Sequence, residues 1–283
     1  LPASTMTTTR RQLLSLGVAG ASALSLAQAS RGHAAAAQGP GNKASIVLIH
    51  GAWQGGWGWQ KVVPLLWAAG HPTTTPTLSG MGERRNVPPA ASGLQVHIDD
   101  IVAHLEMQDL KDVVLVGHSY GGCVLSGVLA RQTGRVAHAI YLDAYVPLRG
   151  EGIISLLTPE ERQPIEALAA TGGAIPVPPE DTWGERWGLT NPAMRAWAAP
   201  RMTPQPALTF TETIASDPFA QPVRLTYLKC RDNPNPGFWA MSKRIRADRR
   251  FTYREIAGPH MVMLTNPTGF TQTLLATINT PAR

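Results

Sequence analysis

Short apolar runs rich in Val, Ile and Leu alternate with longer segments of helical periodicity from residue 44 onward. Continuous apolar runs of this length are typical of strands that are buried on both faces. The predicted strands are 46–49, 73–77, 113–116, 139–142, 224–228 and 251–256. The predicted helices are 57–69, 94–108, 119–133, 237–247 and 267–278. This order predicts an α/β fold with a mostly parallel sheet and helices on both faces.

The alternation stops between residues 147 and 222, where Pro and Gly are frequent. Helix starts are predicted at Thr158-Pro159, at Asn191-Pro192 and at Thr203-Pro204. We therefore expect a helical insertion, a lid, over 147–222, between core segments 40–146 and 223–283. Some of its large apolar side chains are expected to face a ligand, although packing against the core explains each one equally well; they are Trp183, Trp187, Met194, Trp197, Met202 and Phe210.

Residues 1–39 have a different composition from the rest. Arg10-Arg11 precedes an apolar run that ends near Ala29, and a tract of small residues follows. This pattern resembles a twin-arginine export signal and predicts a periplasmic or secreted protein, with Met6 as the natural start. The apolar run is too short and too interrupted to predict stable membrane insertion. The alternative is an alanine-rich disordered tail.

Composition narrows the functional classes. The 283 residues are 43% hydrophobic, as in a packed soluble protein, and the three leader arginines account for half of the net charge of +6. No Lys/Arg run with interleaved aromatics is present, so we expect no nucleic-acid partner. The two cysteines, Cys123 and Cys230, do not have the spacing of a metal site or a disulfide framework. The sequence indicates no particular oligomeric state.

The most informative motif is Gly117-His118-Ser119-Tyr120-Gly121, directly after the strand predicted at 113–116. A strand, a G-x-S-x-G turn and a helix form a nucleophile elbow, in which the glycines permit a strained turn that presents the serine hydroxyl. The motif makes Ser119 the candidate nucleophile, and it places the Tyr120 amide where an oxyanion would form. An ordinary Gly-Ser turn is the alternative interpretation.

A serine nucleophile needs a base and a carboxylate that orients the base. His260 follows the last predicted strand in a tight Gly258-Pro259 loop, and it is the best placed of the histidines. For the carboxylate we prefer Asp232, which follows strand 224–228. Asp143, at the end of strand 139–142, is the alternative acid.

The second oxyanion donor is expected in the loop after the first strand, Ile49-His50-Gly51-Ala52-Trp53. Gly51 allows the backbone to approach the substrate closely, and the Ala52 amide is the predicted donor.

Five motifs together resemble the α/β-hydrolase superfamily, and more narrowly its branch of plant methylesterases, hydroxynitrile lyases and bacterial carbendazim-hydrolysing esterases. They are 50–53 (HGAW), 78–84 (LSGMGER), 117–122 (GHSYGG), 141–147 (YLDAYVP) and 258–260 (GPH). The resemblance implies an α/β-hydrolase fold with Ser119 as nucleophile, His260 as base, Asp232 as acid, and Ala52 and Tyr120 as the oxyanion hole. The lyases of this branch have threonine and lysine where this chain has Gly51 and Met261, a difference that favours ester hydrolysis.

The expected reaction is acyl transfer from a small-to-medium hydrophobic or aromatic ester, or a carbamate, to water. It requires no cofactor and no metal. Candidate substrate-binding residues are Gly51, Trp53, Trp57, Trp183, Trp187, Met194, Trp197 and Met261. The alternatives are a hydroxynitrile lyase, a cofactor-free oxygenase or a non-hydrolytic small-molecule receptor on the same fold.

Overall fold

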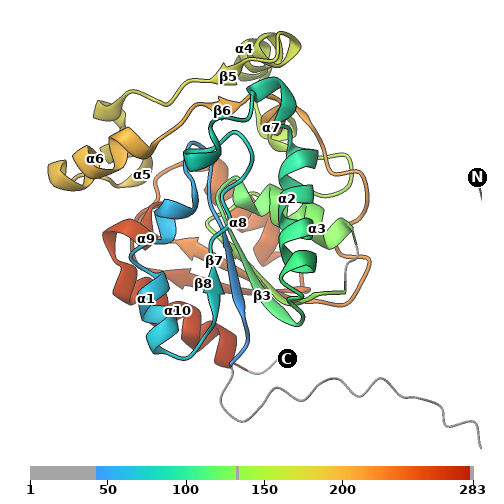
Figure 1. Cartoon of the computed structure of the whole chain (residues 1–283), viewed down its shortest axis with the longest axis vertical. Coiled ribbons are helices and arrows are strands. Elements are labelled where there is room, and N and C mark those ends of the chain that lie inside the picture. Colours follow the sequence, from blue (N-terminus) through green and yellow to red (C-terminus); the bar gives the residue numbers. More distant parts are fainter. Residues whose placement is uncertain (1–42, 132–133, 281–283) are drawn as a thin grey trace, which may run out of the picture. The chain divides into compact units, whose positions relative to one another are not determined.

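A six-stranded parallel sheet forms the centre of the structure, a computed structural model that describes residues 43–131 and 134–280 (Figure 1). The strand order is β2-β1-β3-β4-β7-β8, and every ladder in this sheet is parallel. The strands are β1 (Ile46–Ile49), β2 (Thr73–Thr74), β3 (Val113–His118), β4 (Val136–Leu142), β7 (Arg224–Cys230) and β8 (Phe251–Ile256). The leader predicted over 1–39 lies outside the described residues.

Helices cover both faces of the sheet because successive strand side chains point to opposite faces. Val47 and Ile49 pack in one hydrophobic cluster, with residues of α2 (Leu94–Met107), α3 (Gly121–Ala130) and α8 (Pro236–Arg246). Ile46 and Leu48 pack in the other, with residues of α1 (Val63–Ala68), α9 (Val262–Thr265) and α10 (Pro267–Asn279). The predicted α/β fold is confirmed.

The predicted strands and helices of the core are all present, with shifted boundaries. The helix predicted at 57–69 is divided into a 3-10 turn, η1 (Gly56–Trp59), and α1. The strand predicted at 73–77 is reduced to the two residues of β2. The start of α10 is as predicted: the Asn266 side chain accepts a hydrogen bond from the Gly269 amide at 3.0 Å. Two further 3-10 turns are η2 (Gly82–Arg84) and η3 (Pro89–Ala91).

The 147–222 segment contains short helices and one small sheet. Its elements are η4 (Ile153–Leu156), α4 (Pro159–Ala170), β5 (Ala174–Ile175), η5 (Glu180–Thr182), α5 (Trp183–Trp187), α6 (Pro192–Ala198), η6 (Ala199–Arg201), β6 (Gln205–Pro206) and α7 (Leu208–Thr211). The Thr158 and Asn191 side chains cap α4 and α6, so these two predicted starts are confirmed.

The helix start predicted at Thr203-Pro204 is wrong, and the segment has one pair of two-residue strands beside its helices. After Pro204 the chain enters β6, which pairs with β5 in an antiparallel ladder, Ile175 opposite Gln205. The Gln205 side chain also accepts a hydrogen bond from the Trp53 amide at 3.0 Å. These long-range contacts override the local capping pattern.

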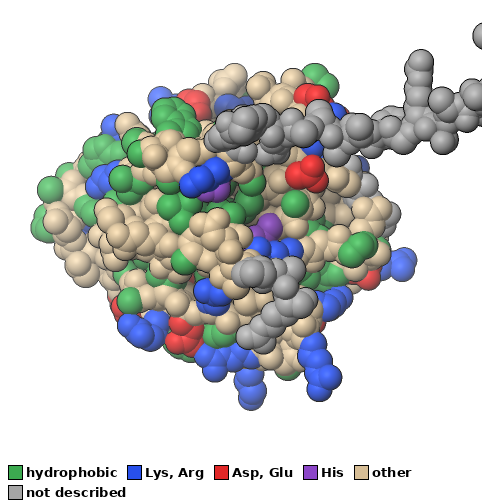
Figure 2. All heavy atoms as spheres, turned by 90° about the horizontal axis from the view of Figure 1, so that it is seen from below, with side chains coloured by type: hydrophobic (Ala, Val, Ile, Leu, Met, Phe, Trp, Pro, Cys, Tyr) green, Lys and Arg blue, Asp and Glu red, His purple; other side chains and the backbone are tan. Residues whose placement is uncertain are grey.

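Charged side chains are dispersed over the surface that Figure 2 shows. Seen from below Figure 1, Lys and Arg side chains lie between hydrophobic and uncharged ones, with fewer acidic groups among them (Figure 2). In the described part of the chain no helix combines the length and the apolar composition that a membrane span requires.

Candidate active site

Ser119 lies at a strained turn between β3 and α3. Its φ is +55°, in the left-handed region that side chains other than glycine rarely adopt. A Cβ at Gly117 would lie 2.6 Å from the Gly121 carbonyl oxygen, and one at Gly121 would lie 2.7 Å from the His50 carbonyl oxygen. Both glycines of the motif are therefore required sterically. The turn has the geometry of a nucleophile elbow.

His260 lies on the loop after β8 and contacts a carboxylate from a neighbouring strand end. Its Nδ1 is 2.7 Å from Oδ2 of Asp143, the residue that follows β4. Asp143 is itself held in place, because its amide donates to the Leu228 carbonyl at 2.7 Å. Burial alone would raise the pKa of Asp143, but the His260 ring and then the Lys229 ammonium group hold it below its ordinary value. Asp143 is thus an ionised carboxylate that orients His260.

The preference for Asp232 as the partner of His260 is wrong. The Asp232 side chain is 59% exposed, and its carboxylate accepts a hydrogen bond from the Gly258 amide at 2.9 Å. The next residue, Asn233, points inward: its Nδ2 is 2.5 Å from Asp143 Oδ2 and 3.3 Å from His260 Nδ1. Adjacent side chains at the end of β7 face different sides, so Asp232 shapes the loop that carries His260 and does not contact the imidazole.

Two main-chain amides beside Ser119 are free to bind an oxyanion. Within the described residues, neither the Ala52 nor the Tyr120 N–H donates a hydrogen bond. A Cβ placed on Gly51 would lie 3.1 Å from the Ser119 Cβ, so this loop runs directly against the serine. The arrangement has the form of the predicted oxyanion hole.

His50 fixes the orientation of the 50–53 loop, which holds the predicted oxyanion donor Ala52. Its Nδ1 lies 2.8 Å from the Gly51 carbonyl oxygen, and its Nε2 accepts a hydrogen bond from the Leu78 amide at 3.1 Å. Because a trans peptide directs its C=O and N–H to opposite sides, binding the Gly51 carbonyl turns the Ala52 N–H the other way. Burial lowers the pKa of His50 to about 4, so the ring is neutral and donates from Nδ1.

Backbone strain is concentrated at this site. Five non-glycine residues in the described ranges have a positive φ: Trp53, Asp109, Asp112, Ser119 and Asp143. Three of them lie at the site: Trp53 follows the predicted oxyanion donor Ala52, Ser119 is in the elbow, and Asp143 is the partner of His260. Strain of this kind persists where the surrounding structure enforces it, and it is characteristic of functional sites.

The predicted substrate-binding tryptophans fall into two groups. The Trp53 ring contacts the rings of Trp187 and Phe210, and Phe210 stacks on Tyr120 with ring centroids 6.0 Å apart. These aromatic rings lie beside the elbow.

The other predicted substrate-binding residues pack against each other or against the core. Trp57 and Trp197 form a pair, with 5.5 Å between their ring centroids. Trp183 packs on Trp187, Met194 packs against the α1/α10 cluster, and the fully buried Met261 accepts from Gln54 through its sulfur.

Two polar residues of the site were not predicted from the sequence. Lys229, a fully buried residue of β7, donates to Asp143 Oδ1 at 2.9 Å, and Asn233 completes the shell around the same carboxylate. A lysine inside the apolar run 225–230 was the available signal, because a lysine is almost never fully buried without a partner.

The hydroxyl of Ser119 and the outer nitrogen of His260 remain available for chemistry. Over 43–131 and 134–280, neither Ser119 Oγ nor His260 Nε2 makes a hydrogen bond, although both residues are at least 90% buried. No cluster of three or more His, Cys, Asp or Glu side chains suited to a metal occurs in the same ranges.

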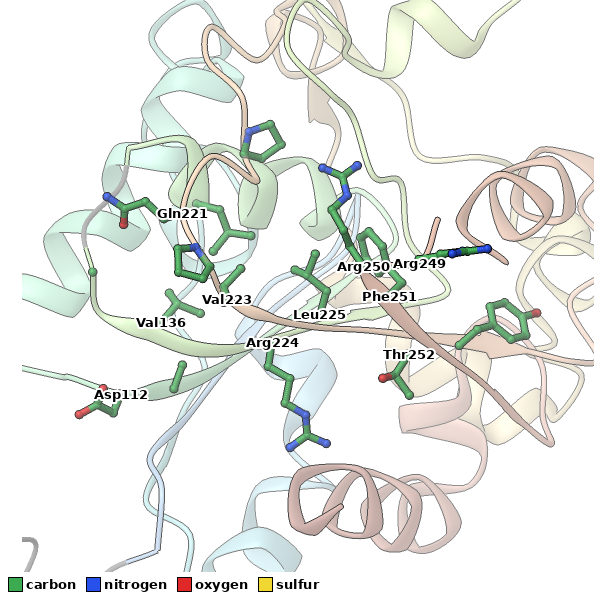
Figure 3. Close-up of a pocket in the computed structure, with 16 residues that line it drawn as sticks. Asp112, Val136, Gln221, Val223, Arg224, Leu225, Arg249, Arg250, Phe251 and Thr252 are labelled. Carbon is green, nitrogen blue, oxygen red and sulfur yellow. The ribbon is translucent and has the colours of Figure 1, made fainter. Parts of the chain in front are cut away.

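A separate hollow of about 880 Å³ lies at the opposite edge of the sheet (Figure 3). Its lining includes Val136, Arg224 and Phe251, the first residues of β4, β7 and β8. Ser119, Asp143 and His260 all follow the carboxyl ends of their strands, so none of them reaches this hollow. The three candidate catalytic residues therefore lie at the carboxyl ends of the strands, away from this hollow.

Comparison with known proteins identifies the family. The model of the alpha/beta hydrolase family matches residues 46–273, which span nearly all of the described core. The chain belongs to the alpha/beta hydrolase family. The match contains the elbow, the 50–53 loop with the predicted oxyanion donor, and the loop of His260.

The relatives of this alpha/beta hydrolase include bacterial and plant esterases. A carbendazim hydrolyzing esterase from Nocardioides sp. (strain SG-4G) is 41% identical over 130 residues, which are 46% of this chain and 53% of the relative. Salicylic acid-binding protein 2 of Nicotiana tabacum is 35% identical over 36% of this chain and 40% of the relative. The chain thus spans about half or less of the length of the curated relatives that it matches. The branch predicted from the motifs is confirmed.

Solved structures show the same fold. An extracellular alpha/beta-hydrolase from a Paenibacillus species superposes with a TM-score of 0.73 at 23% identity, covering 83% of this chain and 98% of the other. A pyrethroid hydrolase gives a TM-score of 0.66 at 19% identity, covering 84% of this chain and 98% of the other.

Proposed function

We propose that this alpha/beta hydrolase is a serine esterase that cleaves small-to-medium hydrophobic or aromatic esters, or carbamates, through an acyl-enzyme. The observation that carries the proposal is the strained Ser119 flanked by two unpaired main-chain amides, with the His260–Asp143 pair on the adjoining loops. Two relatives that are esterases by name support this reaction class: the carbendazim hydrolyzing esterase from Nocardioides and Methylesterase 8 of Arabidopsis thaliana.

In the proposed reaction these groups act in the following order. Ser119 Oγ bonds to the carbonyl carbon as its proton passes to His260 Nε2, and the carbonyl oxygen takes the negative charge between the Ala52 and Tyr120 amides. The tetrahedral intermediate collapses, the C–O bond to the leaving alcohol breaks, and the proton on His260 moves to that alcohol. Water then attacks the acyl carbon and gives a proton to His260, which returns it to Ser119 as the acid leaves. Asp143 stabilises the imidazolium throughout.

Aromatic side chains form the walls of the proposed substrate site. The rings of Trp53, Trp187 and Phe210 adjoin the elbow, and such surfaces favour hydrophobic or aromatic groups. The side chain that follows His260 is the buried thioether of Met261 and not a cation. A charge that would stabilise a departing cyanide is therefore absent at this position, which favours hydrolysis over lyase chemistry.

The test is turnover of p-nitrophenyl acetate together with covalent labelling by a fluorophosphonate. Ser119→Ala should lower kcat by about 10⁴-fold or more and abolish labelling, because the other groups alone retain only a small part of the catalysis. Ser216→Ala, at an exposed serine, is the matched control and should behave like the wild type. Near-normal turnover or labelling in Ser119→Ala would refute the proposal, and a wild type that binds esters without turnover would indicate a receptor.

A further inference from the structure

Lys229 is a charged residue in the interior of the sheet. It belongs to β7, its side chain is fully buried, and its neighbours in the strand, Leu228 and Cys230, are fully buried as well. Moving an ammonium group out of water is unfavourable, and a buried ion pair commonly adds little net stability over apolar side chains of the same size. A purely structural reason for this lysine is therefore weak.

The three N–H directions of the ammonium group have three partners. Nζ lies 2.9 Å from Asp143 Oδ1 and donates to the Cys230 carbonyl at 2.6 Å, and the Trp239 ring lies over it with its centroid 4.4 Å away. A carboxylate, a carbonyl and an aromatic face satisfy the cation completely. The site is built around a charged lysine.

The same carboxylate orients the base. Asp143 Oδ1 faces Lys229, and Oδ2 faces His260 and Asn233, so the cation and the imidazole share one anion. We propose that Lys229 is a positioning residue that fixes the Asp143 carboxylate and neutralises part of its charge, and thereby sets the basicity of His260. This inference rests on the proposed esterase function.

The groups that face His260 from the surrounding elements support an electrostatic role. Asp143 comes from the end of β4, His118 from β3 with its ring centroid 4.5 Å away, and Phe238 from α8 at 4.7 Å. Burial and the neighbouring His260 hold the pKa of His118 well below its ordinary value, so this ring is neutral. Among the described contacts of His260 and of its carboxylate, Asp143 and Lys229 are thus the charged groups, and removing the lysine changes the balance directly.

The experiment is the pH dependence of kcat/KM for p-nitrophenyl acetate in the full chain with Lys229→Met and Lys229→Gln. Without the ammonium, the imidazolium faces an unneutralised carboxylate, so the acidic limb should move to higher pH by about one unit or more. We expect kcat to fall at least 10-fold with KM changed less than about 3-fold, because Asp143 loses an anchor and not a substrate contact. Lys243→Met, the same change at an exposed position of α8, should leave the profile unaltered.

Several results would overturn the inference. If the acidic limb of the kcat/KM profile lies at the wild-type pH in both Lys229 variants, whatever their stability, Lys229 contributes only to packing. A Lys229→Gln enzyme with the wild-type limb would show that hydrogen bonding is sufficient without the charge. If neither variant folds, Trp239→Leu decides, because Trp239 is 39% exposed and its loss lets water screen the ammonium. A smaller shift in the same direction supports the role, and no shift refutes it. Failure of the esterase proposal is recognised separately, by a wild type without Ser119-dependent turnover.

Discussion

Asp143→Asn tests the central correction that the structure makes to the sequence-based site. Asparagine keeps the shape of the side chain but cannot accept the His260 Nδ1–H with both the charge and the geometry of a carboxylate, so the imidazole takes the wrong tautomer. The expected loss in kcat is about 10⁴-fold, the size associated with this substitution where a buried carboxylate orients a catalytic histidine. Asp232→Asn should change kcat only a few-fold, because that carboxylate is exposed and binds the Gly258 amide.

The same substitution has a calculable cost in stability. Asp143 accepts from Lys229, so its removal leaves a buried ammonium without a counter-charge, and breaking such a pair costs about 3–5 kcal/mol. Asp232→Asn should cost about 1 kcal/mol or less, as for other exposed ion pairs and loop hydrogen bonds.

The assay is kcat/KM for p-nitrophenyl acetate at pH 7.5, measured at a temperature where circular dichroism shows both variants folded. Fluorophosphonate labelling of Ser119 reports independently on whether the base still activates the serine. A larger loss in Asp232→Asn than in Asp143→Asn would refute the assignment of the acid. Equal small losses would show that neither carboxylate serves His260.

Three further predictions concern the acid, the elbow and pH. The double substitution Asp143→Asn/Asn233→Asp moves the carboxylate to position 233, whose side chain already reaches His260. Its kcat should be at least 10-fold higher than that of Asp143→Asn, and an equal kcat in steady-state kinetics would contradict that geometry. Gly121→Ala should lower kcat at least 10-fold and stability by about 1–3 kcal/mol in urea unfolding, whereas Gly184→Ala, where a Cβ has room, should be neutral. The folded-state pKa of His50 is lowered to about 4, so His50 alone should lower the free energy of unfolding by about 3 kcal/mol from pH 6.5 to pH 4, as the unfolded chain takes up the proton. The buried His97 and His138 add to the same slope, so His50→Gln should make the slope smaller by that amount in urea titrations and should not abolish it.

Local patterns in the sequence were sufficient to predict the fold and most of the candidate site. The apolar runs predicted where the strands lie along the chain, and the glycines around Ser119 predicted the elbow because their requirement is steric and local. The position of His260 followed from its place after the last strand. The carboxylate partner of His260 could not be predicted in this way, because Asp232 and Asp143 both come after strands. Which of them meets the imidazole depends on which side chain turns inward after β7, and that is the side chain of Asn233 and not of Asp232.

The errors in the 147–222 segment have a related cause. A Thr-Pro pair predicts a helix start on local grounds, but after Thr203-Pro204 the chain pairs with β5 and receives the Trp53 amide. Lys229 was not predicted as a site residue, because the predicted strand ended at Leu228 and the carboxylate that the buried lysine meets, Asp143, follows the neighbouring strand β4. Partners distant in the chain decide all three cases.

The 147–222 segment is joined to the loops that bear the base and the oxyanion donors. The Met261 amide donates to the Trp187 carbonyl, the Thr203 amide donates to the Trp53 carbonyl, and any side chain at Gly188 would collide with Pro259. An exchange of this segment between relatives would therefore not be modular: a chimaera that acquires a new substrate range would also inherit a displaced imidazole and a misdirected amide, and would need compensating changes in those loops to regain its turnover.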